Sequence, residues 1–230
     1  MPQKATDAHC HIGGISTAMP AAVCAINETQ WKELENAQNP LLKKVYGLFL
    51  GEALSHTDAQ IESAVQSLEK LCREASAIGE FGLDKRFTSV LPFHRQERIF
   101  DAHVALSVSS GLPCVLHCVG AWGFLLKKLK AAKRAGAGAF LLHSAGCAPE
   151  LAREFMRLDC YFSFSKRQLT SRKGLETAAA VPPERLLLES DDIPSPARYA
   201  EDLEVLSKIG NYAPDELSDI IFNNFNRLFR

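Results

Sequence analysis

Short apolar runs recur along the chain and alternate with longer amphipathic stretches. Such runs are typical of strands that are buried on both faces of a parallel sheet, and the amphipathic stretches predict helices that cover it. The first strand differs, because polar and apolar residues alternate along it. We predict eight strands, at residues 4–12, 21–27, 45–50, 77–82, 113–117, 138–143, 160–164 and 186–191.

Helices are predicted between most of these strands, from apolar stripes at helical spacing and from residues that begin or end a helix. Thr57 can cap one helix, and Gly111 is a natural stop for another. Residues 13–20 are too few for a full helix after the first strand. The predicted helices are residues 28–37, a segment after Thr57, residues 92–109, 124–134 and 149–158, a short piece ending at 180, and residues 197–208 and 214–229.

Eight strand–helix units favour an α/β fold, namely a closed (β/α)8 TIM barrel with a shortened first β–α connection. A doubly wound open sheet is the alternative. Its dinucleotide-binding version lacks support because no GxGxxG motif follows an early strand. No internal repeat or linker interrupts the pattern, so we expect residues 1–230 to form a single domain.

Composition narrows the classes of partner. The chain has 230 residues, of which 47% are hydrophobic, and a formal net charge of −1. It can therefore bury a large core, but it has no global charge that would attract nucleic acid or a membrane surface. No apolar run resembles a signal peptide or a membrane span, and no obligate protein partner is evident. The seven cysteines form no CxxC pair, which predicts reduced thiols and a cytoplasmic protein.

The segment Asp7-Ala8-His9-Cys10-His11 carries the first candidate chemistry. In a strand, Asp7, His9 and His11 share one face, and neighbouring members of the set lie about 6–7 Å apart. Two imidazoles and a carboxylate at that spacing can close on one cation, with Cys10 on the other face as a packing residue. The alternative is an edge strand with solvated polar residues.

Further polar residues fall at the carboxyl ends of the first, fourth, fifth, sixth and eighth strands, the face on which these barrels build active sites. A single buried polar ending is often a satisfied core residue, but five on one rim favour a functional site. Together with His9 they make a ligand set for two divalent ions, in which the glutamate can bridge. Nitrogen-rich sets favour zinc or manganese over magnesium. The five are His11, Glu80, His117, His143 and Asp191.

Such a pair of ions would activate a water molecule for hydrolysis. Asp7, at the bottom of the first strand, could orient one of the ligating imidazoles.

In this order and spacing, these motifs resemble those of the TatD family of metal-dependent hydrolases, within the amidohydrolase-like barrels. The resemblance covers nearly the whole chain. Its C-terminal signature is Asn223-Asn224 with Phe229. The other matching pieces are residues 7–11 and 79–84, Gln96 and Phe100, and residues 112–117, 143–146 and 187–191.

The resemblance implies a role for each matched residue. The first metal would be held by His9, His11, Glu80 and Asp191, and the second by Glu80, His117 and His143. Asp191 would also orient and deprotonate the attacking water. Family members are described as DNases or 3′–5′ exonucleases, which implies a phosphodiester substrate, either nucleic acid or a smaller molecule.

Two departures from the family lie beside the expected metals. The third strand usually ends Gly-x-His-Pro, whereas here Gly47 is followed by Leu48-Phe49-Leu50. The histidine at 117 is followed by Cys118-Val119-Gly120 instead of Ser-Arg, so an arginine suited to phosphate is missing.

Replacement contacts to an anion could come from three basic segments, although each could be an ordinary solvated charge. We prefer Lys166-Arg167, which follows a strand onto the same rim; the others are Lys85-Arg86 and Arg95. Trp122 could stack on a base or pack on its helix. We expect the remaining histidines, His56, His94 and His103, to be exposed.

These features predict a hydrolase that uses a metal-activated water, and the family resemblance implies that its substrates are phosphodiesters. Hydrolysis of an amide, ester or lactone is the first alternative, because Phe49 and Val119 make the rim less polar. A binding protein that keeps the barrel without turnover is the second. It predicts that His117→Ala or Asp191→Asn leaves the biological activity intact.

Overall fold

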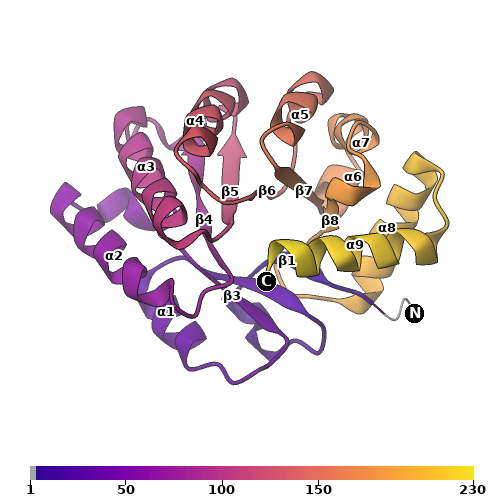
Figure 1. Cartoon of the computed structure of the whole chain (residues 1–230), viewed down its shortest axis with the longest axis horizontal. Helices are drawn as coiled ribbons and strands as arrows, with labels where there is room; N and C mark the ends of the chain where they lie inside the picture. The colour runs from indigo at the N-terminus through magenta and orange to yellow at the C-terminus, as the bar shows by residue number, and fades with distance from the viewer. Residues whose placement is uncertain (1–3) are drawn as a thin grey trace.

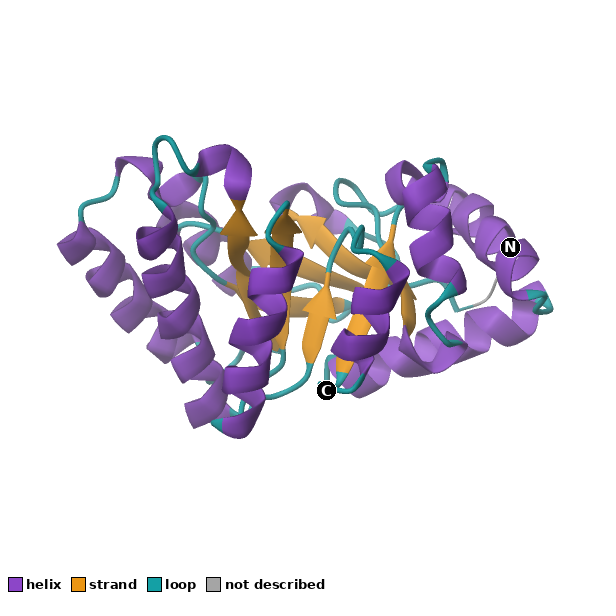
Figure 2. Ribbon diagram, turned by 90° about the horizontal axis from the view of Figure 1, so that it is seen from above, coloured by secondary structure: helices purple, strands orange, loops and turns teal. Residues whose placement is uncertain are grey.

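The computed structural model describes residues 4–230 as eight parallel strands, arranged in chain order around a nearly closed barrel. Helices surround the strands (Figure 1), and the strands at the front of Figure 2 point away from the end of the barrel where the C-terminus lies. The predicted TIM barrel is confirmed. The strands are β1 (Asp7–His11), β2 (Ala21–Ala25), β3 (Leu42–Tyr46), β4 (Ala77–Asp84), β5 (Cys114–Val119), β6 (Phe140–Leu142), β7 (Cys160–Phe164) and β8 (Leu186–Leu188).

The barrel closes between β8 and β1 through individual hydrogen bonds. Seven parallel pairings run from β1–β2 to β7–β8. Across the remaining gap, the amide of Asp191 donates to the carbonyl of His9 at 3.0 Å. The amide of Ser190 donates to Oδ1 of Asp7 at 3.1 Å. The loop after β8 is therefore tied to the first strand at the carboxyl end of the barrel.

Two helix boundaries lie at residues that the sequence marks. Thr57 forms a capping box with Gln60, and Gly111, with a φ of 74°, ends α3. After β1 there is only a short 3-10 turn, Ile12–Ser16. None of the helices within residues 4–230 is long and apolar enough to cross a bilayer. They are α1 (Glu28–Glu35), α2 (Asp58–Leu71), α3 (Phe93–Ser110), α4 (Trp122–Arg134), α5 (Pro149–Met156), α6 (Lys166–Leu169), α7 (Arg172–Ala179), α8 (Pro196–Gly210) and α9 (Pro214–Leu228).

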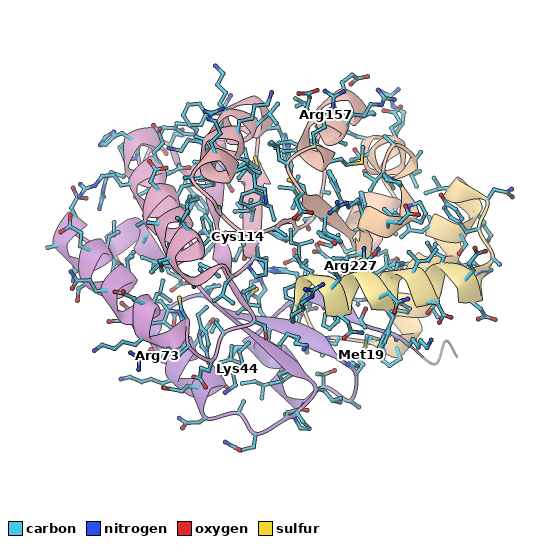
Figure 3. The ribbon with its side chains drawn as sticks, viewed as in Figure 1. Met19, Lys44, Arg73, Cys114, Arg157 and Arg227 are labelled. Atoms are coloured by element: carbon cyan, nitrogen blue, oxygen red, sulfur yellow. The ribbon has the colours of Figure 1, made fainter. Side chains whose placement is uncertain are left out.

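The C-terminal helix α9 packs at the end of the barrel where the strands begin. Nδ2 of Asn224 donates to the carbonyls of Pro183 and Leu186, at 2.7 and 2.9 Å, which fixes α9 to the start of β8. Arg227 lies near the end of α9 (Figure 3). It lines a cavity of about 460 Å³ together with Pro113, which precedes β5. This end of the barrel is opposite the one where the polar endings of the strands lie.

The third strand lies earlier than predicted, at Leu42–Tyr46 instead of residues 45–50. Beyond Tyr46 the chain forms no regular strand, although the amides of Gly47 and Phe49 still donate to the carbonyls of Ala25 and Ile26. The amide of Leu48 donates to Nε2 of His103 at 3.0 Å. A Cβ at Gly47 would lie 2.4 Å from the carbonyl carbon of Gly79, so glycine allows this close approach. Leu48 and Leu50 are thus buried in a loop, which an apolar run does not distinguish from a strand.

His103 was predicted to be exposed, and that prediction is wrong: its side chain is fully buried. The ring stacks on Phe81 with 4.6 Å between centroids. Its Nδ1 lies 2.7 Å from the carbonyl oxygen of Ile99, to which it donates, and its Nε2 accepts from Leu48. The neutral ring thus satisfies two buried backbone groups. Of the other two histidines, His94 is exposed and His56 is half-buried.

A pH-dependent contribution to stability follows from this burial. Burial lowers the pKa of His103 from 6.5 to about 4, although its hydrogen bond to Ile99 acts in the opposite direction. As the pH falls, the His103 imidazole is therefore protonated in the unfolded chain before it is protonated in the folded one. Its contribution to the free energy of unfolding is complete above pH 6.5 and is lost as the pH falls toward 4. When the pH is lowered from 6.5 to about 4, the free energy of unfolding should decrease in both proteins. We expect the decrease to be about 3 kcal/mol smaller in His103→Gln than in the wild type.

Urea denaturation at a series of pH values measures this difference. His94→Gln, which removes an exposed histidine from the same helix, is the matched control. Identical pH profiles for His103→Gln and the wild type would contradict the assignment.

Candidate metal centre

The six predicted ligand residues come together at the carboxyl end of the barrel. His9 and His11 lie on β1, Glu80 on β4 and His117 on β5. The sixth and eighth strands are shorter than predicted, so His143 and Asp191 lie in the loops that follow them. Their ligand atoms form three overlapping groups in which all atoms lie within 4.8 Å of one another. The groups are His9, His11 and Glu80; His9, His143 and Asp191; and Glu80, His117 and His143.

Glu80 lies between two pairs of imidazoles. Its Oε1 is 2.9 Å from Nδ1 of His117 and 2.8 Å from Nε2 of His143. Its Oε2 faces the other pair, at 3.7 Å from Nε2 of His9 and 3.9 Å from Nε2 of His11. The carboxylate is buried, and each of its oxygens faces one pair of imidazoles. A carboxylate that bridges two cations would have this geometry.

Asp191 faces the same pair of histidines from the opposite side of the barrel. Its Oδ1 lies 3.4 Å from Nε2 of His9 and 3.5 Å from Nε2 of His11. Its backbone has a φ of 55°, a left-handed conformation that aspartate tolerates better than most residues. The side chain is 29% exposed, which leaves it open to the pocket above the cluster.

The cluster keeps its carboxylates ionised. Burial acts to raise the pKa of Glu80, but the surrounding imidazoles, above all His143, hold that pKa well below its ordinary value. Burial likewise acts to raise the pKa of Asp191, and hydrogen bonds with His11 and His9 outweigh it and lower the pKa. The pKa of His143 is raised in turn, because the charge of Glu80 outweighs the effect of burial. Fixed negative charge thus faces a ring of imidazole nitrogens.

These side chains fit divalent cations. The buried Nε2 of His9 has no hydrogen-bond partner among residues 4–230, although it points at two carboxylates. An orphaned buried nitrogen is expected where it is a metal ligand, and imidazole with carboxylate is a set that zinc and manganese accept.

Two further carboxylates lie beside the candidate ligand histidines, on the side of each ring that faces away from the cluster. Neither was given a role from the sequence. Oδ2 of Asp84 lies 2.9 Å from Nε2 of His117, so Nδ1 of that ring faces the cluster. Glu189 lies 3.7 Å from Nδ1 of His143 and is itself held by Ser144 and Ser163. The hydrogen bond to Asp84 fixes the tautomer of His117, whereas Nδ1 of His143 has no hydrogen-bond partner within residues 4–230. Asp84 could have been found from its spacing, because it shares a strand face with Glu80 four residues earlier.

Asp7 does not orient an imidazole, so that expectation is wrong. Its Oδ1 accepts from the amides of His9 and Ser190, each at 3.1 Å. It therefore holds two backbone segments together at the closure of the barrel. The side chain next to the His9 ring is the thiol of Cys24, 3.2 Å from Nδ1. Cys10 is buried and packs away from the cluster, as predicted.

A pocket of about 130 Å³ opens above His117 and His143, the second pair of histidines. Phe49 packs edge-on against His117, with 5.2 Å between centroids. The charged and polar lining of the pocket includes two arginines from the basic segments that we considered as contacts to an anion. The pocket is lined by Arg86, His117, Cys118, Val119, His143, Ser144, Arg167, Gln168 and Asp191.

The other basic candidates lie elsewhere. Lys166 is 3.7 Å from Glu201 and does not line the pocket. Arg95 pairs with Asp58 at 2.9 Å. Trp122 packs edge-on against Phe155. Of the two roles considered for it, stacking on a base and packing, this contact fits packing. Only one member of each basic pair, Arg86 and Arg167, therefore reaches the pocket.

Comparison with known proteins shows which family the chain resembles. Residues 6–230 match the family model of TatD related DNases. YjjV of Escherichia coli strain K12, described as an uncharacterized metal-dependent hydrolase, is 26% identical over 97% of this chain and 96% of its own. The 3′–5′ ssDNA/RNA exonuclease TatD of Klebsiella pneumoniae strain 342 is 34% identical over 56% of this chain and 50% of its own.

Solved structures share the barrel. The crystal structure of YjjV from E. coli K12 superposes with a TM-score of 0.83 at 23% identity, over 100% of this chain and 99% of that one. The organophosphorus hydrolase from Deinococcus radiodurans has a TM-score of 0.66 at 16% identity, over 100% and 93% of the two chains. With the family match across nearly the whole sequence, these likenesses show that the chain belongs to the TatD family of metal-dependent hydrolases.

Proposed function

We propose that this protein hydrolyses phosphodiester bonds with a pair of divalent cations, and that Glu80 bridges them. The observation that carries the proposal is the buried carboxylate of Glu80, with one oxygen toward each pair of imidazoles. One cation would be held by His9, His11, Glu80 and Asp191. The other would be held by Glu80, His117 and His143.

When bound, such cations lower the pKa of a water molecule and neutralise charge on phosphate oxygens. The chain's own contribution is to place a base beside that water. Asp191 suits this role because its carboxylate is ionised, partly exposed and lines the pocket. Its carboxylate would accept the proton of the attacking water, while the buried Glu80 holds the cluster together.

Two observations support a phosphodiester as the substrate. A relative that is 34% identical is named as a 3′–5′ ssDNA/RNA exonuclease. In addition, Arg86 and Arg167 line the pocket, and arginine is well suited to phosphate.

An ester or lactone is the second candidate, because Val119 lines the pocket and Phe49 covers one edge of His117. Rates for bis(p-nitrophenyl) phosphate and for p-nitrophenyl esters, with manganese, zinc or magnesium added, separate the two candidates.

Hydrolysis should depend on the cations and on Asp191. Chelation should abolish hydrolysis of bis(p-nitrophenyl) phosphate, and one of the three metals should restore it. In Asp191→Asn we expect kcat to fall about 100- to 10,000-fold, because the base is lost. Asp192→Asn, which changes the exposed neighbour, should keep wild-type kcat. A folded Asp191→Asn protein with full turnover would exclude Asp191 as the base, and full biological activity without turnover would favour the binding protein.

Asp84 should act on metal affinity through His117. Asp84→Asn keeps the size of the side chain but removes the charge beside Nε2 of the ring. We expect affinity for manganese or zinc to fall about 10-fold or more, as is usual when such a supporting group is lost. Calorimetric titration of the metal-free protein measures this change directly. Asp101→Asn, at an exposed carboxylate that pairs with Lys128, is the control; equal affinities in the two variants would refute the role.

A further inference from the structure

Two arginines flank the pocket on opposite sides of the second pair of histidines. Arg86 follows β4 and Arg167 follows β7, whereas His117 and His143 belong to β5 and the end of β6. Because the strands lie in the order β4-β5-β6-β7, the two guanidinium groups enter the pocket from either side of the imidazoles. The arginine that the family carries after the fifth-strand histidine is missing from this chain.

Arg86 is held in place by a buried carboxylate. Its Nε lies 3.0 Å from both oxygens of Asp84, and its Nη2 lies 2.6 Å from Oδ2. Its Nη1 makes no hydrogen bond to the part of the chain that the structure describes, residues 4–230, so those donors stay available. A side chain that is already fixed loses little conformational entropy when it binds a ligand.

Arg167 carries a charge that nothing nearby neutralises. Within residues 4–230 its guanidinium takes part in no ion pair, whereas its neighbour Lys166 lies 3.7 Å from Glu201. Gln168, which follows it, also lines the pocket. An unpaired arginine at the edge of a polar pocket is a ready donor to an anion.

The size of the pocket limits what these arginines can recognise. Its volume of about 130 Å³ is below the roughly 300 Å³ at which pockets begin to enclose whole small-molecule ligands. No phenylalanine, tyrosine or tryptophan is among the residues that line it. A phosphate group and the atoms next to it fit this space, and a nucleoside would extend along the rim.

We propose that Arg86 and Arg167 form an anion clamp that selects substrates whose phosphate carries a negative charge, over neutral esters and phosphotriesters. This inference rests on the proposed hydrolysis and adds its specificity-determining residues. The clamp recognises the charged phosphate group.

The test compares two substrates with the same leaving group, anionic bis(p-nitrophenyl) phosphate and neutral diethyl p-nitrophenyl phosphate. In Arg86→Met and in Arg167→Met we expect the ratio of kcat/KM for the anionic substrate to that for the neutral one to fall about 10- to 100-fold. For Arg167→Met the loss should appear mainly in KM. Displacement of His117 through Asp84, a side effect possible in Arg86→Met, would slow both substrates alike and leave the ratio unchanged.

Arg172→Met is the matched control, because Arg172 is exposed, lies five positions beyond Arg167 and does not line the pocket. It should keep the wild-type ratio. A wild-type ratio in Arg86→Met or in Arg167→Met would overturn the clamp.

Binding of inorganic phosphate to the manganese-loaded protein, measured by calorimetry, does not depend on turnover. Its Kd should weaken about 10-fold in both variants and stay unchanged in Arg172→Met. If the wild type hydrolyses neither substrate, the proposed function fails, yet a loss of phosphate affinity in both variants still supports the clamp. Phosphate affinity equal to wild type in both variants would overturn the clamp even if hydrolysis is confirmed.

Discussion

The site depends on one buried carboxylate that four imidazoles surround. Glu80 is 3% exposed, and each of its oxygens faces a different pair of histidines. A carboxylate this deep in an apolar barrel is unfavourable unless positive charge or hydrogen bonds compensate for its lost hydration. The histidines from β1, β5 and the end of β6 provide that compensation, and their positions along the chain are explained by this requirement.

The rest of the barrel holds these rings in position around Glu80. Gly82 lets β4 and β5 approach closely, because a Cβ there would lie 1.8 Å from the carbonyl oxygen of His117. Asp84 fixes the His117 ring, and Glu189 lies behind His143. Asp7 ties the loop that carries Asp191 to the first strand. The supporting residues are therefore spread over the same strands as the ligands, so the fold and the site are specified together.

The meeting of the six candidate side chains at one end of the barrel could be predicted from the sequence, because a buried strand that ends in histidine, glutamate or aspartate differs clearly from its apolar neighbours. His9, Glu80 and His143 could be placed on one rim from the strand order alone. What could not be predicted depends on contacts between distant segments. His103 looks like a surface helix residue until the loop at Leu48 is seen to bond to it. Asp7 has the spacing of an imidazole partner, yet the closure of the barrel turns its carboxylate toward backbone amides.

Anomalous X-ray diffraction from crystals of the protein soaked in manganese or zinc can show whether Glu80 bridges two cations. We expect two anomalous peaks, one on each side of the Glu80 carboxylate. His9, His11 and Asp191 should surround one peak, and His117 and His143 the other. A single peak away from Glu80, or no peak among these side chains at saturating metal, would contradict the bridging role of Glu80.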